Sequence, residues 1–409
     1  MSGREVNDVP TGADPKTLRC RANALAEEVR ELRRRLHMHP ELGGGEERTA
    51  ALVVDRLRSY GLEVTGSLGG HGVMGLLRGT HPGPTVALRA DMDALPMDDA
   101  KEVSYRSRIS GVMHACGHDA HTAILLTTAR LLSEITDGGH NLGGNVKFLF
   151  QPDEEGDGGA LPMLEAGVFK DPDVDVVYAL HVNPEYPTGT VASRAGVVVG
   201  YNDEIKIDVY GRAAHGARPQ TGVDAIVVAA GLINALQTLV SRETSPLEAA
   251  SISLGTISGG YRNTVIAPHV TIEGTIMCLD ARTRCALRSG ADRLITGIAA
   301  SMGAEAYMEY KPGYPAVEND EALVERVRTV ASRHLDPGSY RTLEEPSIGG
   351  EDFSYFGLEA PGCLIALGVA DPSENSPAVS VHNSLFDIDE EALVVGVTMM
   401  AGLALDYLS

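Results

Sequence analysis

The stretch NVKFLFQPDEEGDGG, residues 145–159, decides the fold. Its first part, residues 146–150, is an almost continuous apolar run, which is typical of a strand buried on both faces of a sheet. Its second part changes at once to carboxylates and glycines. In open α/β sheets, ligands bind outside the carboxyl ends of the strands. The stretch therefore predicts a buried strand that delivers acidic residues to a site at one edge of a sheet.

Three further apolar runs predict more buried strands: residues 86–88, 174–180 and 363–367. Helical periodicity lies between them, most clearly at residues 120–135. Residues 18–60 are also helical in character, with a break at Pro40 and the glycines that follow it. Strands that alternate with helices indicate a layered α/β domain with a mixed sheet.

Between residues 200 and 311 the pattern changes. Strands with one solvated face are expected at 205–210 and 270–277, a further strand at 251–257, and an amphipathic helix at 223–240. This order is that of a small ferredoxin-like α+β unit. We therefore expect four segments along the chain: an N-terminal tail at 1–16, the first part of the α/β domain at 17–199, an inserted ferredoxin-like domain at 200–311, and the second part of the α/β domain at 312–409.

The composition excludes several classes of partner. The 409 residues include 56 acidic and 34 basic side chains, which give a formal net charge of −22. Such a surface repels phosphate backbones and anionic lipids, so neither nucleic acid nor a membrane is expected as a partner. No apolar run reaches the roughly 20 residues of a membrane span, and the polar N-terminus lacks a secretion signal. The five scattered cysteines argue against a disulfide framework and for the cytoplasm.

The segment GVMHACGHDAHTA, residues 111–123, carries the densest chemical signal. It places Cys116 and His118 two residues apart just before a predicted helix, where a thiolate and an imidazole can reach one metal ion or two adjacent ions. Alternatively, the cysteine is a small buried hydrophobe beside histidines that only donate hydrogen bonds. The acidic pair after residue 150 and His181 at the end of another apolar run favour the metal site.

Glu154 and Glu155 form that acidic pair. An adjacent pair of carboxylates is often a solvated loop, but its position directly after a buried strand favours a site. Two such carboxylates can divide their roles, because one can bind a metal ion while the other remains free as a general base.

These residues resemble the dinuclear-metal N-acyl-amino-acid amidohydrolases, a branch that includes hippurate hydrolases and auxin-conjugate amidohydrolases. The branch belongs to the aminoacylase and carboxypeptidase-like metallopeptidase clan. The matching motifs run from about residue 33 to residue 393: RRRLHMHPELGGGEERTA, RADMDALP, MHACGHDAHTA, FQPDEEGDGGA, ALHV, GRAAHGARPQTGVDAI, NTVIAP, GGEDFSYF and HNSLFDIDEEAL.

The resemblance implies a role for individual residues. The implied metal ligands are Cys116, His118, Glu155, His181 and His382, with the thiolate bridging two divalent ions. Glu154 would be the general base and acid, and Asp93 would orient a ligand. Asp91 stands where the wider clan has a metal-binding histidine, so we do not assign it as a ligand. The donor set suits Zn²⁺ or Mn²⁺, and Co²⁺ or Ni²⁺ also fit.

The resemblance further implies that the larger domain is catalytic and that the inserted domain is a lid, through which two chains form a homodimer. In the lid, His215 would stabilise an oxyanion, and Asn263 would contact a small N-acyl substrate. The implied activity is hydrolysis of the amide bond of an N-acyl amino acid or a related N-acyl amine. A peptidase or an N-carbamoyl hydrolase would use the same centre, and a non-catalytic, metal-stabilised binding protein is disfavoured because Glu154 is present beside a full ligand set.

Two positions depart from the family pattern. Met277 stands where the family usually has an arginine that holds the free carboxylate of the substrate, and Gln220 stands where the branch often has a histidine. Methionine cannot pair with a carboxylate. Either Arg262 or another basic group takes over this role, or the substrate lacks the carboxylate. We therefore expect weaker activity on simple N-acetyl amino acids than the resemblance implies.

Overall fold

The computed structural model describes residues 15–139, 141–371 and 379–409, and it divides into two compact units. The large unit comprises the chain up to Gly196 together with Glu318–Glu344 and Tyr355–Ser409. The small unit comprises Val197–Val317 and Glu345–Ser354. The expected tail at 1–16 lies outside the described residues except for Pro15 and Lys16, which belong to the first helix.

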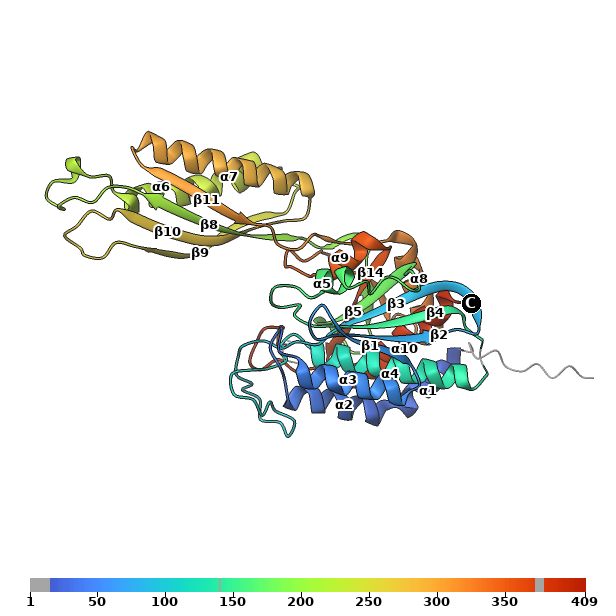
Figure 1. Ribbon diagram of the computed structural model, residues 1–409. Coiled ribbons are helices and arrows are strands. Elements are labelled where there is room, and N and C mark those ends of the chain that lie inside the picture. The colour runs from blue at the N-terminus through green and yellow to red at the C-terminus, as the bar shows by residue number, and fades with distance from the viewer. Residues whose placement is uncertain (1–14, 140, 372–378) are drawn as a thin grey trace, which may run out of the picture. The chain divides into compact units, whose positions relative to one another are not determined.

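The large unit is built on one mixed sheet of eight strands, in the order β1-β2-β4-β3-β5-β14-β6-β13 (Figure 1). The strands are β1 (Glu63–Leu68), β2 (Gly72–Arg78), β3 (His81–Asp91), β4 (Gly143–Gln151), β5 (Val176–Pro187), β6 (Val191–Ser193), β13 (Tyr340–Thr342) and β14 (Gly362–Ala370). β3 runs parallel to β4 and β5, whereas β2 is antiparallel to β1 and β4. The mixed α/β sheet expected from the apolar runs is therefore confirmed.

The register of the three central strands explains where polar residues meet. Arg89 on β3 pairs with Leu149 on β4 and with Ala179 on β5, so Asp91, Gln151 and His181 lie at one level of the sheet. β3 and β4 end at this level. The expectation that β5 also ends there was wrong, because β5 continues to Pro187 alongside β14.

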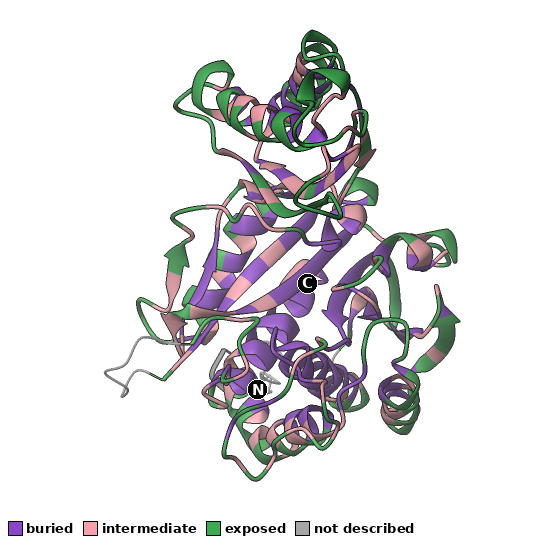
Figure 2. Ribbon diagram, turned by 90° about the vertical axis from the view of Figure 1, so that its left-hand side faces the viewer, coloured by how far each residue is buried: buried purple, intermediate pink, exposed green. Residues whose placement is uncertain are grey.

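Helices cover the sheet, and the strands between them are mostly buried (Figure 2). They are α1 (Pro15–Ala24), α2 (Ala26–Met38), α3 (Glu47–Ser59), α4 (His118–Asp137), α5 (Ala160–Glu165), α8 (Glu321–His334), α9 (Phe353–Glu359) and α10 (Ala392–Tyr407). The central helix is α4, which packs against α2, α10 and β3 and is buried almost all round. Gly117 permits its start, because this residue has φ +88° and an added Cβ would lie 2.4 Å from Val182 Cγ2.

The small unit has a four-stranded antiparallel sheet in the order β11-β8-β10-β9, with a core of its own. Its elements are β8 (Tyr201–Tyr210), η1 (Pro219–Thr221), α6 (Ala225–Thr238), η2 (Leu239–Glu243), β9 (Ala250–Gly259), β10 (His269–Cys278), α7 (Ala281–Ser301) and β11 (Glu305–Lys311). Two short strands, β7 (Gly196–Val199) and β12 (Val317–Asn319), form a separate pair. β11 was not predicted from the sequence, although the alternation of Ala306, Met308 and Tyr310 with more exposed residues was an available signal.

One helical segment in the described part of the chain, Ala225–Glu243, is long and apolar enough to cross a membrane by length and composition alone. Its mean hydropathy is 1.5, and a third of it is buried. The buried residues Val228, Ala229, Leu232 and Leu236 follow helical spacing, and α6 packs on the sheet of the small unit. This pattern is that of a helix with one face in a protein core.

Glu46 links α3 to the acidic loop after β4. It immediately precedes α3, it is fully buried, and its Oε1 accepts the backbone N–H of Asp153 at 2.8 Å. Asp153 has φ +57°, in the left-handed region, and it immediately precedes Glu154. Burial raises the pKa of Glu46 to about 7. The carboxyl group therefore helps to hold an uncommon backbone conformation beside the acidic pair.

Leu126 on α4 tests the packing of this central helix, because its side chain is fully buried. We expect Leu126→Ala to lower the free energy of unfolding by about 2–5 kcal/mol, since it removes buried methyl groups and leaves a cavity. Urea unfolding measures the change. The control is Leu358→Ala in the same unit, where the side chain is 68% exposed and the expected change is below about 0.5 kcal/mol. Equal effects of the two variants would contradict the packing.

Glu46 also predicts a pH dependence of stability. Because its pKa is raised in the folded protein, folding favours the protonated form, and this contribution is lost as the pH rises through 7. Relative to Glu46→Gln, which cannot ionise, the wild type should lose about 2–3 kcal/mol of stability between pH 4.5 and pH 8. Urea unfolding of both proteins across this range measures the difference. Glu47→Gln, at an exposed position, controls for the loss of one charge. A constant difference between wild type and Glu46→Gln would refute the prediction.

Candidate metal centre

His118 is the first residue of α4, and its ring is oriented by Asp93. His118 Nδ1 lies 3.0 Å from Asp93 Oδ1, so the Nδ1–H group donates to the carboxylate. The opposite ring nitrogen, Nε2, is buried and has no hydrogen-bond partner among the described residues. A buried imidazole nitrogen with no partner is costly, and a metal ion would satisfy it.

Cys116 and His181 approach His118 from a loop and from β5. The Sγ atom of Cys116 lies 3.4 Å from His181 Nε2. The other ring nitrogen of His181, Nδ1, donates to the carbonyl of Val182 at 2.8 Å and so orients the ring. One candidate ligand atom from each of Cys116, His118 and His181 lies within 4.8 Å of the others. Three donors of this kind are sufficient for a zinc-type site.

A second donor group contains Cys116 again, together with Glu155 and His382, also within 4.8 Å. His382 Nε2 lies 3.0 Å from Glu155 Oε1. His382 has φ +60°, a conformation that costs about 1–3 kcal/mol for a non-glycine residue unless its surroundings enforce it. Its N–H donates to the carbonyl of Ala115 at 2.8 Å, beside Cys116. The two donor groups therefore share one sulfur atom.

Glu154 lies beside both groups without belonging to either. Its side chain is 8% exposed, and its Oε2 is 4.0 Å from His118 Nε2. The neighbouring residue Glu155 is fixed through its backbone, because its N–H donates to Asp93 Oδ2 at 2.9 Å. Asp93 thus bonds to His118 with one oxygen and to the acidic loop with the other.

The electrostatics of the two groups suit a cation. Burial raises the pKa of the Cys116 thiol well above its usual range, so the sulfur needs a cation beside it to become a thiolate. Burial also opposes ionisation of Glu155, but His382 and His118 hold its pKa below the ordinary value. Burial alone would lower the pKa of His118, yet Asp91 and Cys116 raise it well above normal. This donor set of sulfur, imidazole and carboxylate fits divalent ions such as zinc.

Asp91 is occupied by other partners. It accepts from His121 Nδ1 at 2.6 Å and from Arg89 at 2.7 Å. The second ring nitrogen of His121 accepts the N–H of Val182 at 2.9 Å, so the ring is neutral and oriented. Burial lowers the pKa of His121 to about 4. The sequence assigned no role to His121, although its place in the motif of residues 113–123 was the available signal.

The candidate residues of the inserted domain lie together in the small unit. His215 forms an isolated β-bridge with Val265, which follows Arg262 and Asn263 in a turn closed by the bond from Val265 N to Arg262 O. His215, Arg262 and Asn263 are all exposed. His215 Nδ1 accepts the N–H of Ala217 at 3.0 Å, which leaves its Nε2 on the surface. Met277 is on β10, paired with Asn202 and with Ser251.

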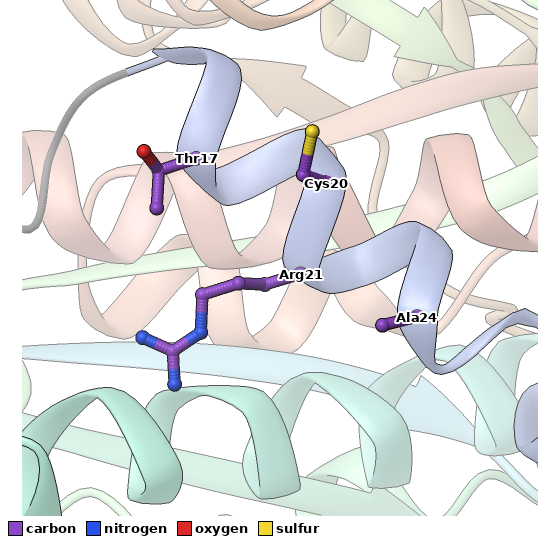
Figure 3. A pocket seen from close by; sticks show the side chains of 4 residues that line it. All are labelled: Thr17, Cys20, Arg21 and Ala24. Carbon is purple, nitrogen blue, oxygen red and sulfur yellow. The ribbon is translucent and has the colours of Figure 1, made fainter.

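A hollow on α1 is a separate feature (Figure 3). It is lined by Thr17, Cys20, Arg21 and Ala24. None of these residues belongs to either donor group, so this hollow is not the candidate centre.

Comparison with known proteins places the chain in a family. Residues 87–406 match the model of peptidase family M20/M25/M40. The chain is 36% identical over 383 residues to thermostable carboxypeptidase 2 of Saccharolobus solfataricus, covering 92% of this chain and 94% of that protein. It is 36% identical over 393 residues to the N-acetyl-L-cysteine deacetylase of Bacillus subtilis, covering 94% of this chain and 90% of that protein.

A solved structure agrees with these relatives. The Bacillus subtilis YXEP protein, described as a dinuclear metal binding peptidase from the M20 family, superposes with a TM-score of 0.80 and 32% identity, covering 94% of this chain and 99% of that one. These matches confirm the resemblance drawn from the motifs. Because they extend over nearly the whole chain, the protein belongs to peptidase family M20/M25/M40.

Proposed function

We propose that the protein is a metal-dependent amidohydrolase that cleaves the amide bond of an N-acyl amino acid or a related N-acyl amine. The observation that carries this proposal is the pair of donor groups that share Cys116, with Glu154 beside them. The relatives support the reaction class, since one is named as a deacetylase of an N-acetyl amino acid and another as a carboxypeptidase. Both activities break an amide bond with water.

Two divalent ions would be held by the donor groups. We assign His118 and His181 to one ion, Glu155 and His382 to the other, and Cys116 to both. When bound, such ions act as Lewis acids that activate water and polarise a carbonyl group. We propose Zn²⁺ or Mn²⁺, with Co²⁺ and Ni²⁺ as substitutes, because the mixed donors accommodate all four.

Glu154 would move the proton. Its carboxylate would take a proton from the attacking water and then deliver it to the nitrogen of the departing amine, which otherwise leaves poorly as an anion. Asp93 would keep His118 and Glu155 in place through the hydrogen bonds described above. In the small unit, we assign His215 to the oxyanion and Arg262 and Asn263 to substrate binding.

We propose that the inserted segment 200–311, which lies within the small unit, is a lid, and that two chains associate through it. The free state of all five cysteines supports a cytoplasmic location. A peptidase or N-carbamoyl hydrolase would keep the same ligands and base and differ only in the substrate pocket. The carboxypeptidase relative favours the peptidase as the second candidate.

Glu154→Gln tests the proposed base. The variant keeps the shape of the side chain but cannot accept a proton, so kcat should fall by roughly 10²–10⁴-fold while two metal ions remain bound. Steady-state kinetics and metal analysis measure the two properties together. Glu165→Gln, on an exposed position of α5, is the matched control. Chelation should abolish activity in the wild type, and added divalent ion should restore it. Substantial turnover by metal-loaded Glu154→Gln would refute the assignment.

Met277 leads to a prediction about substrates. Without an arginine at this position, N-acyl amines that lack a carboxylate should be hydrolysed at least as well as simple N-acetyl amino acids. Comparison of kcat/KM across matched pairs of amides, with and without the carboxylate, measures the preference. Met277→Arg should shift the preference toward the acids, and Met277→Leu is the control. A strong wild-type preference for the carboxylate-bearing set would contradict the prediction.

A further inference from the structure

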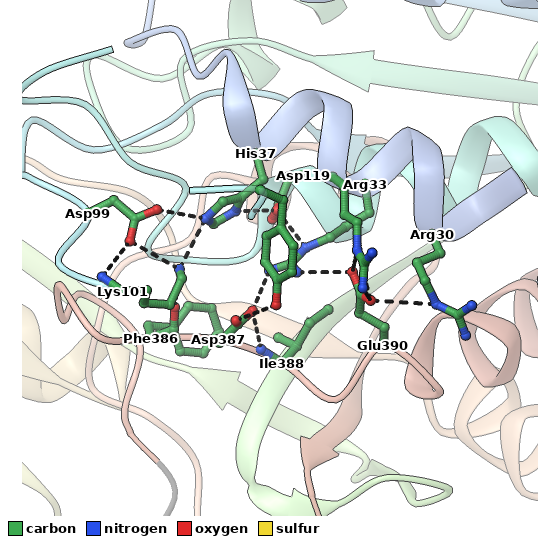
Figure 4. A network of polar contacts seen from close by, with 12 residues as sticks. Arg30, Arg33, His37, Asp99, Lys101, Asp119, Phe386, Asp387, Ile388 and Glu390 are labelled. Atoms are coloured by element: carbon green, nitrogen blue, oxygen red, sulfur yellow. Dashed lines mark hydrogen bonds and ion pairs between the residues drawn. The ribbon is translucent and has the colours of Figure 1, made fainter. Parts of the chain in front are cut away.

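Arg33 on α2 is a fully buried arginine that connects three separate segments of the large unit (Figure 4). Its Nε donates to Asp119 on α4 at 2.8 Å, and one terminal nitrogen donates to Asp387 at 2.8 Å. The other terminal nitrogen lies 3.3 Å from Glu390. The planar fork of the guanidinium allows one side chain to bind three carboxylates in fixed directions.

Two of these segments carry the two donor groups. Asp119 directly follows His118 at the start of α4, and Asp387 lies five residues after His382. Among the described residues, the chain from His382 to Asp387 has neither helix nor strand, and His382 itself is in the left-handed conformation. Its geometry must therefore come from contacts with other parts of the unit.

Further contacts hold the same loop and the start of α4. Lys101 Nζ donates to the carbonyl of Phe386 at 2.7 Å, and the hydroxyl of Tyr105 donates to the second oxygen of Asp387 at 2.7 Å. His37, one turn after Arg33, places Nδ1 2.7 Å from Asp119. The Arg33 guanidinium bridges the start of α4 and the His382 loop directly, because it binds Asp119 and Asp387 at once.

We propose that Arg33 is a positioning residue for the metal centre, and that it sets the separation between the donor group of His118 and the donor group of His382. This inference rests on the proposed function, because it concerns how that centre is held. The two groups should not depend on Arg33 equally. His118 and His181 are held by α4 and β5, whereas the half-exposed His382 is held by its loop. Loss of Arg33 should therefore weaken the ion at Glu155 and His382 selectively.

Arg33→Lys tests the inference, since lysine keeps the buried positive charge but cannot bind three carboxylates in a plane. Stepwise titration of the metal-free enzyme with Co²⁺, followed by its visible absorption, reports each ion separately. We expect one of two ions to bind roughly 10–100-fold more weakly, while the other keeps its affinity and its thiolate absorption band. Arg34→Lys is the matched control, because Arg34 also binds Glu390 but contacts neither Asp119 nor Asp387 and is 40% exposed.

A second variant distinguishes the proposed positioning role of Arg33 from a failure of Arg33→Lys to fold. Asp387→Asn keeps Arg33 and its bond to Asp119 and weakens the bonds that Asp387 accepts from Arg33 and Tyr105, so it should reproduce the selective loss at one ion. Tyr105→Phe, which removes one bond to Asp387 but keeps Arg33, should lose less affinity. Wild-type affinity for both ions in Arg33→Lys and Asp387→Asn would overturn the inference, and so would equal weakening of both ions. If the wild type itself binds no second ion, the proposed centre fails, and the inference fails with it.

Discussion

Buried carboxylates must be matched by donors or cations, and this constraint organises the large unit. Asp91, Asp93 and Asp119 are each at most 1% exposed. Removing the partner of such a charge typically costs about 3–5 kcal/mol, so each partner is tied to its position as firmly as a core side chain. Asp91 is matched by Arg89 and His121, and Asp119 is matched by Arg33 and His37. Asp93 is matched by the ring of His118 and by the backbone N–H of Glu155, which are both candidate ligands.

The result is a candidate metal centre whose donor side chains are oriented by hydrogen bonds within the protein. His118 donates one ring N–H to the carboxylate of Asp93, and His181 donates one ring N–H to the carbonyl of Val182. In each ring the other nitrogen is thereby directed toward the donor group. Cys116 is shared by both donor groups, and Gly117 supplies the left-handed turn that starts α4 immediately after it. Such orientation reduces the conformational entropy that the side chains lose when a cation binds.

Much of this was accessible from the sequence, and the reasons are local. Buried strands such as β4 leave continuous apolar runs, and the change to carboxylates after Phe150 indicated a site at the sheet edge. The length of β5 beyond His181 was not predictable, because it depends on pairing with β14, far along the chain. Arg33 could not be distinguished from its partly exposed neighbour Arg34, since its partner Asp387 lies 354 residues away. Pairings over such distances leave no periodic signal in one chain.

The position of β14 has a consequence for how the protein is made. β14 lies between β5 and β6 in the sheet, and α10 packs against α4, yet both elements follow the small unit in the chain. While the ribosome is still adding the last quarter of the protein, the large unit has a gap in its sheet and has no His382 loop. Contacts between residues far apart in the chain form late in folding. Until β14 is made, the edge of β5 that pairs with β14 therefore stays unpaired. A nascent chain at that stage already contains Cys116, His118, His181 and Glu155, and the second donor group is completed by His382 only near the end of synthesis.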